Sequence, residues 1–178
     1  ETGLGEFYAK TLLAARDAGR IEFDMIFGPA YKGIPLAASV AMNLSRLGCD
    51  VPWAFNRKEA KDHGEGGMFV GKKLTDGEKV VIIEDVMTSG KAMAEVYPKL
   101  KGAADVDITG MVITVDRMER ALEGEKSAVQ SVYEKYGVPV YSIVNMEDII
   151  QGIRDEVIPG KEHLDAMLAY REQYGVKA

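Results

Sequence analysis

One stretch of this chain constrains its fold more than any other: VVIIEDVMTSGKA, residues 80–92. The apolar, β-branched start predicts a buried strand over residues 80–84, and the small residues that follow predict a turn into a helix over residues 89–101. Hydroxyls and backbone N–H groups in such a turn, with the N-terminal end of a helix behind them, favour a bound phosphate. The adjacent acids Glu84 and Asp85 suit ribose hydroxyls instead. The alternative interpretation is an acidic turn followed by a helix cap.

Strands and helices alternate on both sides of this unit. Apolar residues at helical spacing predict a first helix over residues 4–15, and Pro35 fits the first turn of a second helix that begins near Gly33. Further strands are predicted over residues 23–27, 52–56, 108–115 and 138–144, a further helix over 127–136, and two helices from 146 onward, separated at 159–160. This α/β alternation predicts a mainly parallel sheet with helices on both faces, in a single domain over residues 1–178. Ligands of such sheets bind where loops leave the carboxyl ends of strands.

Composition narrows the classes of function. The 178 residues are 47% hydrophobic and carry a formal net charge of −6, which argues against nucleic acid as a bulk partner because phosphate neutralisation needs a basic surface. The longest mostly apolar run, residues 34–44, is too short to cross a bilayer, so we expect no membrane partner. A single cysteine, Cys49, rules out an intrachain disulfide and fits the cytoplasm.

A second turn, FGPAYKGIP over residues 27–35, follows the first strand. Gly28 and Gly33 flank Tyr31 and Lys32, and glycines let a backbone approach an anion closely. Lys32 adds a point charge for phosphate oxygens. The alternative is a tight turn that carries an exposed lysine.

The segment NRKEAKDHGEGG, residues 56–67, is unusually basic and rich in glycine. It shows neither helical nor strand periodicity, so we predict a long, exposed and flexible loop over residues 57–71. Arg57 can grip phosphate oxygens in two-pronged fashion, whereas Lys58 and Lys61 act as charges without fixed geometry. His63 can donate a hydrogen bond to a bound anion or to a reacting centre. The alternative is a solvated charged loop without a ligand.

The fourth unusual stretch, VITVDRMER over residues 112–120, ends a predicted strand in an Asp-Arg pair. Arg117 has a planar fork that matches the oxygens of a planar acid. The usual alternative is an ion pair with Asp116 or another neighbouring acid.

Taken together, these stretches resemble the type I phosphoribosyltransferases, in which a hydrophobic strand, two acids and a small-residue turn bind phosphoribosyl pyrophosphate (PRPP). The basic segment matches the catalytic loop of the orotate branch almost letter for letter. The resemblance implies the type I phosphoribosyltransferase fold, transfer of the phosphoribosyl group from PRPP to orotate, and Mg²⁺ carried mainly by PRPP rather than by protein ligands. It also implies a homodimer in which the catalytic loop reaches into the partner's active site.

The resemblance also implies roles for individual residues. It assigns catalysis to Lys61, His63 and Asp85, and orotate binding to Thr88 and Arg117. It assigns PRPP binding to Tyr31, Lys32, Arg57, Lys58, Lys61, His63, Glu84, Asp85, Val86, Met87, Thr88, Ser89, Gly90, Lys91 and Ala92. Family members carry a further stretch before the first helix that helps to hold orotate and PRPP, and Glu1 begins after that stretch.

Two other functions compete with this interpretation. A phosphoribosyltransferase for adenine, hypoxanthine or uracil would share the PRPP motif, but the basic loop and Arg117 favour an acidic pyrimidine. A PRPP-sensing regulator that binds RNA or DNA would need a basic face beyond the active site, and the net charge of −6 gives no sign of one.

Overall fold

The computed structural model describes residues 2–61, 67–87, 90–120 and 126–176. They form a six-stranded sheet in the order β3-β2-β1-β4-β5-β6. The strands are β1 (Met25–Gly28), β2 (Trp53–Lys61), β3 (Gly67–Gly71), β4 (Lys79–Ile83), β5 (Asp107–Asp116) and β6 (Val140–Asn145). Each neighbouring pair is parallel except β2 and β3, which are antiparallel at one edge. The predicted mainly parallel sheet is therefore confirmed.

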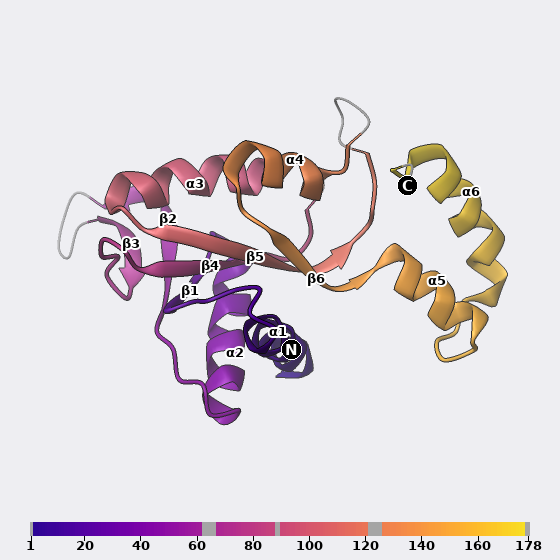
Figure 1. Cartoon of the computed structure of the whole chain (residues 1–178), viewed down its shortest axis with the longest axis horizontal. Helices are drawn as coiled ribbons and strands as arrows, with labels where there is room; N and C mark the ends of the chain where they lie inside the picture. Colours follow the sequence, from indigo (N-terminus) through magenta and orange to yellow (C-terminus); the bar gives the residue numbers. More distant parts are fainter. Residues whose placement is uncertain (1, 62–66, 88–89, 121–125, 177–178) are drawn as a thin grey trace.

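Helices cover both faces of this sheet, as predicted (Figure 1). The helices α1 (Thr2–Asp17) and α2 (Gly33–Arg46) lie on one face, and α3 (Lys91–Ala103) and α4 (Ala128–Tyr136) lie on the other. Side chains of successive strand residues point to opposite faces, so Ile26 and Val81 pack with α1 and α2, whereas Phe27 and Ile82 pack with α3 and α4. The sheet thus separates two hydrophobic cores.

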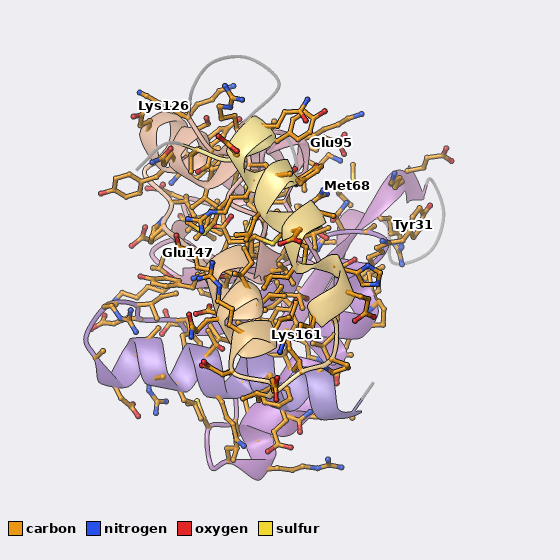
Figure 2. All side chains as sticks on the ribbon, turned by 90° about the vertical axis from the view of Figure 1, so that its right-hand side faces the viewer. Tyr31, Met68, Glu95, Lys126, Glu147 and Lys161 are labelled. Atoms are coloured by element: carbon orange, nitrogen blue, oxygen red, sulfur yellow. The ribbon has the colours of Figure 1, made fainter. Side chains whose placement is uncertain are left out.

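The tail contains the two predicted helices, α5 (Met146–Arg154) and α6 (Leu164–Tyr174), joined through the short 3₁₀ helix η1 (Lys161–His163). Figure 2 looks onto these helices, with Glu147 on α5 and Lys161 at the connection. The end of α6 is fixed to the segment that follows β5: the N–H of Arg120 donates to the carbonyl of Tyr174 at 2.9 Å. None of the described helices is long and apolar enough to cross a membrane.

The prediction of a long exposed loop over residues 57–71 was wrong. β2 continues to Lys61, and β3 returns antiparallel to it, with Asn56 opposite Phe69 and Lys61 opposite Gly67. Charged residues are compatible with this hairpin because it forms the sheet edge, where side chains reach solvent. Residues 62–66, the centre of the predicted flexible loop, lie outside the described residues.

The predicted start of the third helix also needs correction. α3 begins at Lys91 rather than at Ser89, and Gly90 stands before it with a left-handed φ of 68°. Ser89 and Thr88 lie outside the described residues. A left-handed residue interrupts helical geometry, so the helix cannot extend back through position 90.

The strand order creates a crevice between β1 and β4. These strands are parallel neighbours, yet α2 follows β1 onto one face of the sheet while α3 follows β4 onto the other (Figure 1). The loops after the two strands therefore diverge, and ligands of open α/β sheets bind at such switch points.

Candidate active site

The turn after β1 is held by close backbone packing. A Cβ added at Gly33 would lie 2.9 Å from the carbonyl carbon of Gly28 and 3.0 Å from the carbonyl oxygen of Ile83. Glycine is needed at position 33 because backbone atoms of the same turn and of β4 leave no room for a Cβ. The sequence pattern predicted a different reason for this glycine, the close approach of an anion. From β2, the side-chain oxygen of Asn56 accepts a hydrogen bond from the N–H of Ala30 at 3.1 Å.

The two acids stand at the carboxyl end of β4, opposite this turn. Lys32 Nζ donates to Asp85 Oδ2 at 3.2 Å, and the N–H of Asp85 donates to Glu84 Oε1 at 3.0 Å. Partial burial is the main reason that the pKa of Glu84 lies above its ordinary value, although the hydrogen bond from Asp85 opposes the shift. The structure thus brings three of the predicted PRPP residues together across the crevice.

The turn after β4 leads past β5 into α3. Val86 forms a bridge with Val115 of β5, and the side chain of Met87 is buried in the core beneath α3 and α4. Gly90 has no side chain and therefore gives α3 no side-chain cap. A hollow beside the start of α3 is lined by Glu84, Val86, Met87, Gly90, Lys91, Ala92 and Met111. Free amides at a helix N-terminus suit a phosphate.

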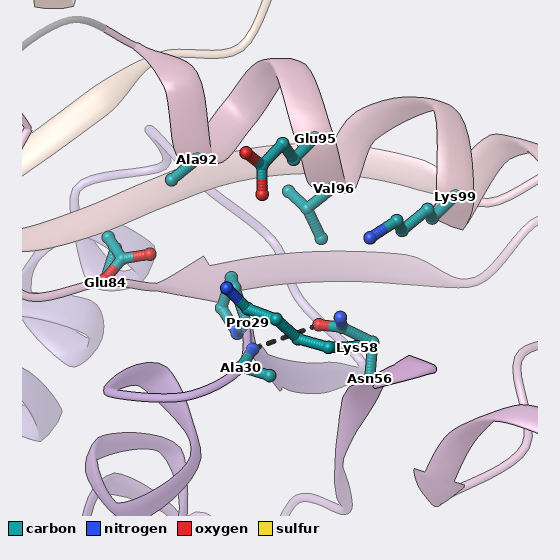
Figure 3. A pocket seen from close by; sticks show the side chains of 9 residues that line it. All are labelled: Pro29, Ala30, Asn56, Lys58, Glu84, Ala92, Glu95, Val96 and Lys99. Carbon is teal, nitrogen blue, oxygen red and sulfur yellow. Dashed lines mark hydrogen bonds between the residues drawn. The ribbon is translucent and has the colours of Figure 1, made fainter. Parts of the chain in front are cut away.

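A second hollow lies between α3 and the turn after β1, next to the first. Figure 3 shows Glu95 and Lys99 of α3 facing Ala30, Asn56 and Lys58 across it. Sequence reasoning missed Asn56, Glu95 and Lys99. The helical spacing of positions 92, 95 and 99 was the available signal, because residues three and four apart share a helix face.

The basic segment contributes through the β2–β3 hairpin. Arg57 Nη1 donates to the carbonyl of Gly67 across the hairpin at 3.2 Å, and Lys58 Nζ lies 5.3 Å from the centre of the Tyr31 ring. Tyr31 is 67% exposed and points outward from the molecule (Figure 2). The hairpin therefore places Lys58 beside the turn after β1. Lys61 ends β2, and His63 lies outside the described residues.

Arg117 follows β5 and, among the described residues, it contacts Glu119 and helix α6 rather than the acid pair. Its guanidinium lies 2.7 Å from Glu119 Oε1 and donates to the Tyr170 hydroxyl at 3.2 Å. Asp116 instead accepts a hydrogen bond from the N–H of Met118 at 2.8 Å. The expected alternative, an ion pair with a neighbouring acid, is present with Glu119. Helix α6, which no sequence pattern connected to this position, supplies the second partner.

The donors at the acid pair suit a shared magnesium site rather than a protein cage. In the part of the chain that the structure describes, no group of three His, Cys, Asp or Glu residues converges as metal ligands. Glu84 and Asp85 provide adjacent carboxylates, and Mg²⁺ commonly combines one or two carboxylates with substrate phosphates and water. The acid pair therefore fits Mg²⁺ when a ligand supplies the remaining oxygens.

Comparison with known proteins identifies a family model, relatives and a solved structure to which this chain is similar. Residues 5–142 match the model of the phosphoribosyl transferase domain. The chain is 45% identical to an orotate phosphoribosyltransferase from Lachnoclostridium phytofermentans, over 98% of this chain and 79% of that protein. It is 48% identical to one from Thiobacillus denitrificans, over 97% and 77%. A crystal structure of orotate phosphoribosyltransferase from Francisella tularensis superimposes with a TM-score of 0.82 at 36% identity, over 98% of this chain and 79% of that chain.

Proposed function

This chain belongs to the phosphoribosyltransferase family and, within it, to the orotate phosphoribosyltransferases, and from that premise we propose which residues carry the reaction. The reaction transfers the 5-phosphoribosyl group of PRPP to orotate, giving orotidine 5′-monophosphate and pyrophosphate in pyrimidine biosynthesis. The observation that carries the assignment of roles is the Lys32–Asp85 contact, which joins the loops after β1 and β4 across the crevice.

PRPP lies across this crevice in the proposed complex. Glu84 and Asp85 bind the ribose hydroxyls, and the turn from Thr88 to Ala92 binds the 5-phosphate at the N-terminus of α3. The pyrophosphate lies against Tyr31 and Lys32, where Lys58 adds positive charge. The backbones of Val86 and Met87 line the ribose, because the Met87 side chain is buried in the core.

Orotate enters from the side of β5. We assign its acidic groups to Arg117 and its ring to the neighbourhood of Thr88. The guanidinium of Arg117 is already paired with Glu119 and Tyr170, so it is oriented before the substrate arrives. Orotate oxygens then replace the Glu119 carboxylate as the hydrogen-bond partner of the Arg117 guanidinium.

Transfer is a displacement at the anomeric carbon of the ribose. The bond to pyrophosphate breaks while a bond to a ring nitrogen of orotate forms, and the proton of that nitrogen passes to the departing pyrophosphate. Bond breaking places positive charge on the ribose and negative charge on the pyrophosphate. The carboxylates of Glu84 and Asp85 stabilise the first charge, and Lys32, Arg57, Lys58, Lys61 and His63 stabilise the second. The protein acts by positioning and electrostatics, without a covalent nucleophile.

Magnesium and a second subunit complete the proposed site. Mg²⁺ bound with PRPP would be held by the Glu84 and Asp85 carboxylates and would neutralise phosphate charge. The segment that contains Lys61 and His63 acts in the active site of the partner within a homodimer. The single cysteine, Cys49, is consistent with a cytoplasmic enzyme.

The direct test is pyrophosphate release from PRPP and Mg²⁺ by the full-length protein, with orotate compared with uracil, adenine, hypoxanthine and guanine. We expect turnover with orotate only. Turnover with a different base would retain the PRPP site and overturn the role of Arg117. Failure with every base, together with tight, salt-dependent binding to nucleic acid, would favour a PRPP-sensing regulator.

A further inference from the structure

Tyr8 of α1 lies fully buried behind the acid pair, with 0% of its surface exposed. Its hydroxyl donates to the carbonyl oxygen of Glu84 at 2.6 Å and lies 2.6 Å from Thr114 Oγ1. These partners are 76 and 106 residues away in the sequence, at the carboxyl ends of β4 and β5. A buried tyrosine hydroxyl normally has a partner, but here both partners lie immediately behind the proposed ribose site.

The direction of these hydrogen bonds follows from the single hydrogen of a phenol. Because Tyr8 donates to Glu84, it accepts from the Thr114 hydroxyl. The N–H of Thr114 in turn donates to the carbonyl of Asp85 at 2.8 Å. The main-chain carbonyls of both acids are therefore fixed, that of Glu84 by Tyr8 and that of Asp85 by Thr114.

We propose that Tyr8 is a positioning residue for phosphoribosyl transfer, which acts through the Glu84 carbonyl and Thr114 to orient the Glu84 and Asp85 carboxylates toward the ribose. This inference rests on the proposed roles of those two acids. An acid pair on an unsupported turn can rotate away from the sugar, and small misplacements of catalytic groups are costly in rate.

The hydroxyl, rather than the ring, is the group that matters for this role. The ring fills part of the core between α1, α2 and the sheet, and phenylalanine would fill the same space. The Glu84 carbonyl oxygen, 2.6 Å away, can only accept a hydrogen bond, so the hydroxyl is needed as the donor.

A matched pair of substitutions separates positioning from stability. Tyr8→Phe removes the hydroxyl behind the acid pair, whereas Tyr141→Phe removes one that donates to the carbonyl of Arg20 at 3.0 Å, far from the crevice. Each variant loses one hydrogen bond donated to a backbone carbonyl, and Tyr8→Phe also removes the acceptor of the Thr114 hydroxyl. In the full-length protein we expect Tyr8→Phe to lower kcat/KM for PRPP roughly tenfold, as the loss of its buried hydrogen bonds permits. Tyr141→Phe should stay within about twofold of the parent, and KM for orotate should change little in either variant.

Thr114→Val provides a second route that leaves α1 intact if Tyr8→Phe folds poorly. We expect it to reduce kcat/KM for PRPP, and the double variant to lose less than the product of the two single losses because both residues belong to one network. Thermal unfolding checks that each variant is folded in the assay. Equal kinetic losses in Tyr8→Phe and Tyr141→Phe, or no loss in Thr114→Val, would overturn the inference. Failure of the proposed function is a separate result, because the parent protein would then show no turnover with orotate.

Discussion

Lys32 and Asp85, 53 residues apart in the sequence, meet at 3.2 Å between Nζ and Oδ2. Their side chains are 78% and 35% exposed, and an exposed ion pair contributes only about 0–1 kcal/mol to stability. The contact is therefore poorly explained as a stabilising feature of the fold. The contact does place a cation and a carboxylate on opposite sides of the crevice. In the proposed complex, the pyrophosphate and the ribose of PRPP would lie between them.

The first prediction concerns this pair. Lys32→Ala should change the free energy of unfolding by less than about 1 kcal/mol, yet raise KM for PRPP roughly tenfold, because the lost charge faces phosphate only in the complex. Lys126→Ala is the matched control, since Lys126 makes a similar exposed pair with Glu134 at 2.6 Å. Steady-state kinetics with varied PRPP and urea unfolding measure the two effects. Equal KM changes in both variants would contradict the role of Lys32.

A second prediction separates the base site from the PRPP site. Arg117→Ala should raise KM for orotate roughly tenfold or more while KM for PRPP changes little, because a charge-assisted fork to the base is lost. Arg154→Ala, at the exposed end of α5, serves as the control. Steady-state kinetics with each substrate varied in turn give the two KM values. A change in KM for PRPP alone in Arg117→Ala would refute the assignment.

A third prediction follows from the packing of the turn after β1. Gly33→Ala should destabilise the protein by about 2–3 kcal/mol, because its methyl group would press on Pro29, Gly28 and Ile83. Gly102→Ala in α3 meets nothing within 4 Å, and should be neutral or stabilising by up to about 1 kcal/mol. Chemical denaturation gives both values. A neutral Gly33→Ala would show that the turn can move away from β4.

The fourth prediction concerns pH and Glu84. A carboxyl whose pKa is raised on folding binds more protons in the folded state, so its contribution to the free energy of unfolding falls as pH rises from its ordinary value of 4.5 through the folded value. Glu84→Gln should therefore be more stable than the parent at pH 7, with the advantage lost by about pH 4, while turnover falls at least roughly tenfold. Urea unfolding across this range tests the sign. Glu134→Gln, at an exposed position of α4, is the control for turnover and should keep the activity of the parent.

The fifth prediction tests the shared active site. Lys61→Ala and Asp85→Asn should each be nearly inactive, whereas an equal mixture should recover roughly a quarter of the parent activity, because half of the dimers would contain one intact site. Mixing Asp85→Asn with Glu84→Ala should give no recovery, since both acids belong to the same subunit's site. Activity after subunit exchange measures this. An inactive first mixture, with exchange demonstrated, would place Lys61 in its own subunit's site.

Local patterns determined the parts of this protein that are built from contiguous residues. The strand β4 and the helix α3 after it could be predicted because apolar runs and helix spacing report backbone geometry directly, although the start of the helix was placed two residues too early. The mainly parallel α/β sheet followed from the alternation of such units. The first part of β2 was predicted as a strand over residues 52–56. Its continuation to Lys61 and the edge strand β3 were not predicted, because charged and glycine-rich residues there lack the alternation that marks a half-buried strand.

The tertiary structure alone decided which distant residues meet. Contacts between Lys32 and Asp85, between Asn56 and Ala30, and between Tyr8 and Glu84 join segments that no periodicity connects. Their existence depends on strand order and on the packing of α1 against the sheet. The sequence by itself thus determined the class of fold, and it singled out the acid pair and the basic segment as candidate site residues. Packing decided how the acid pair is supported, because hydrogen bonds between remote elements form only after the sheet has set their distance and direction.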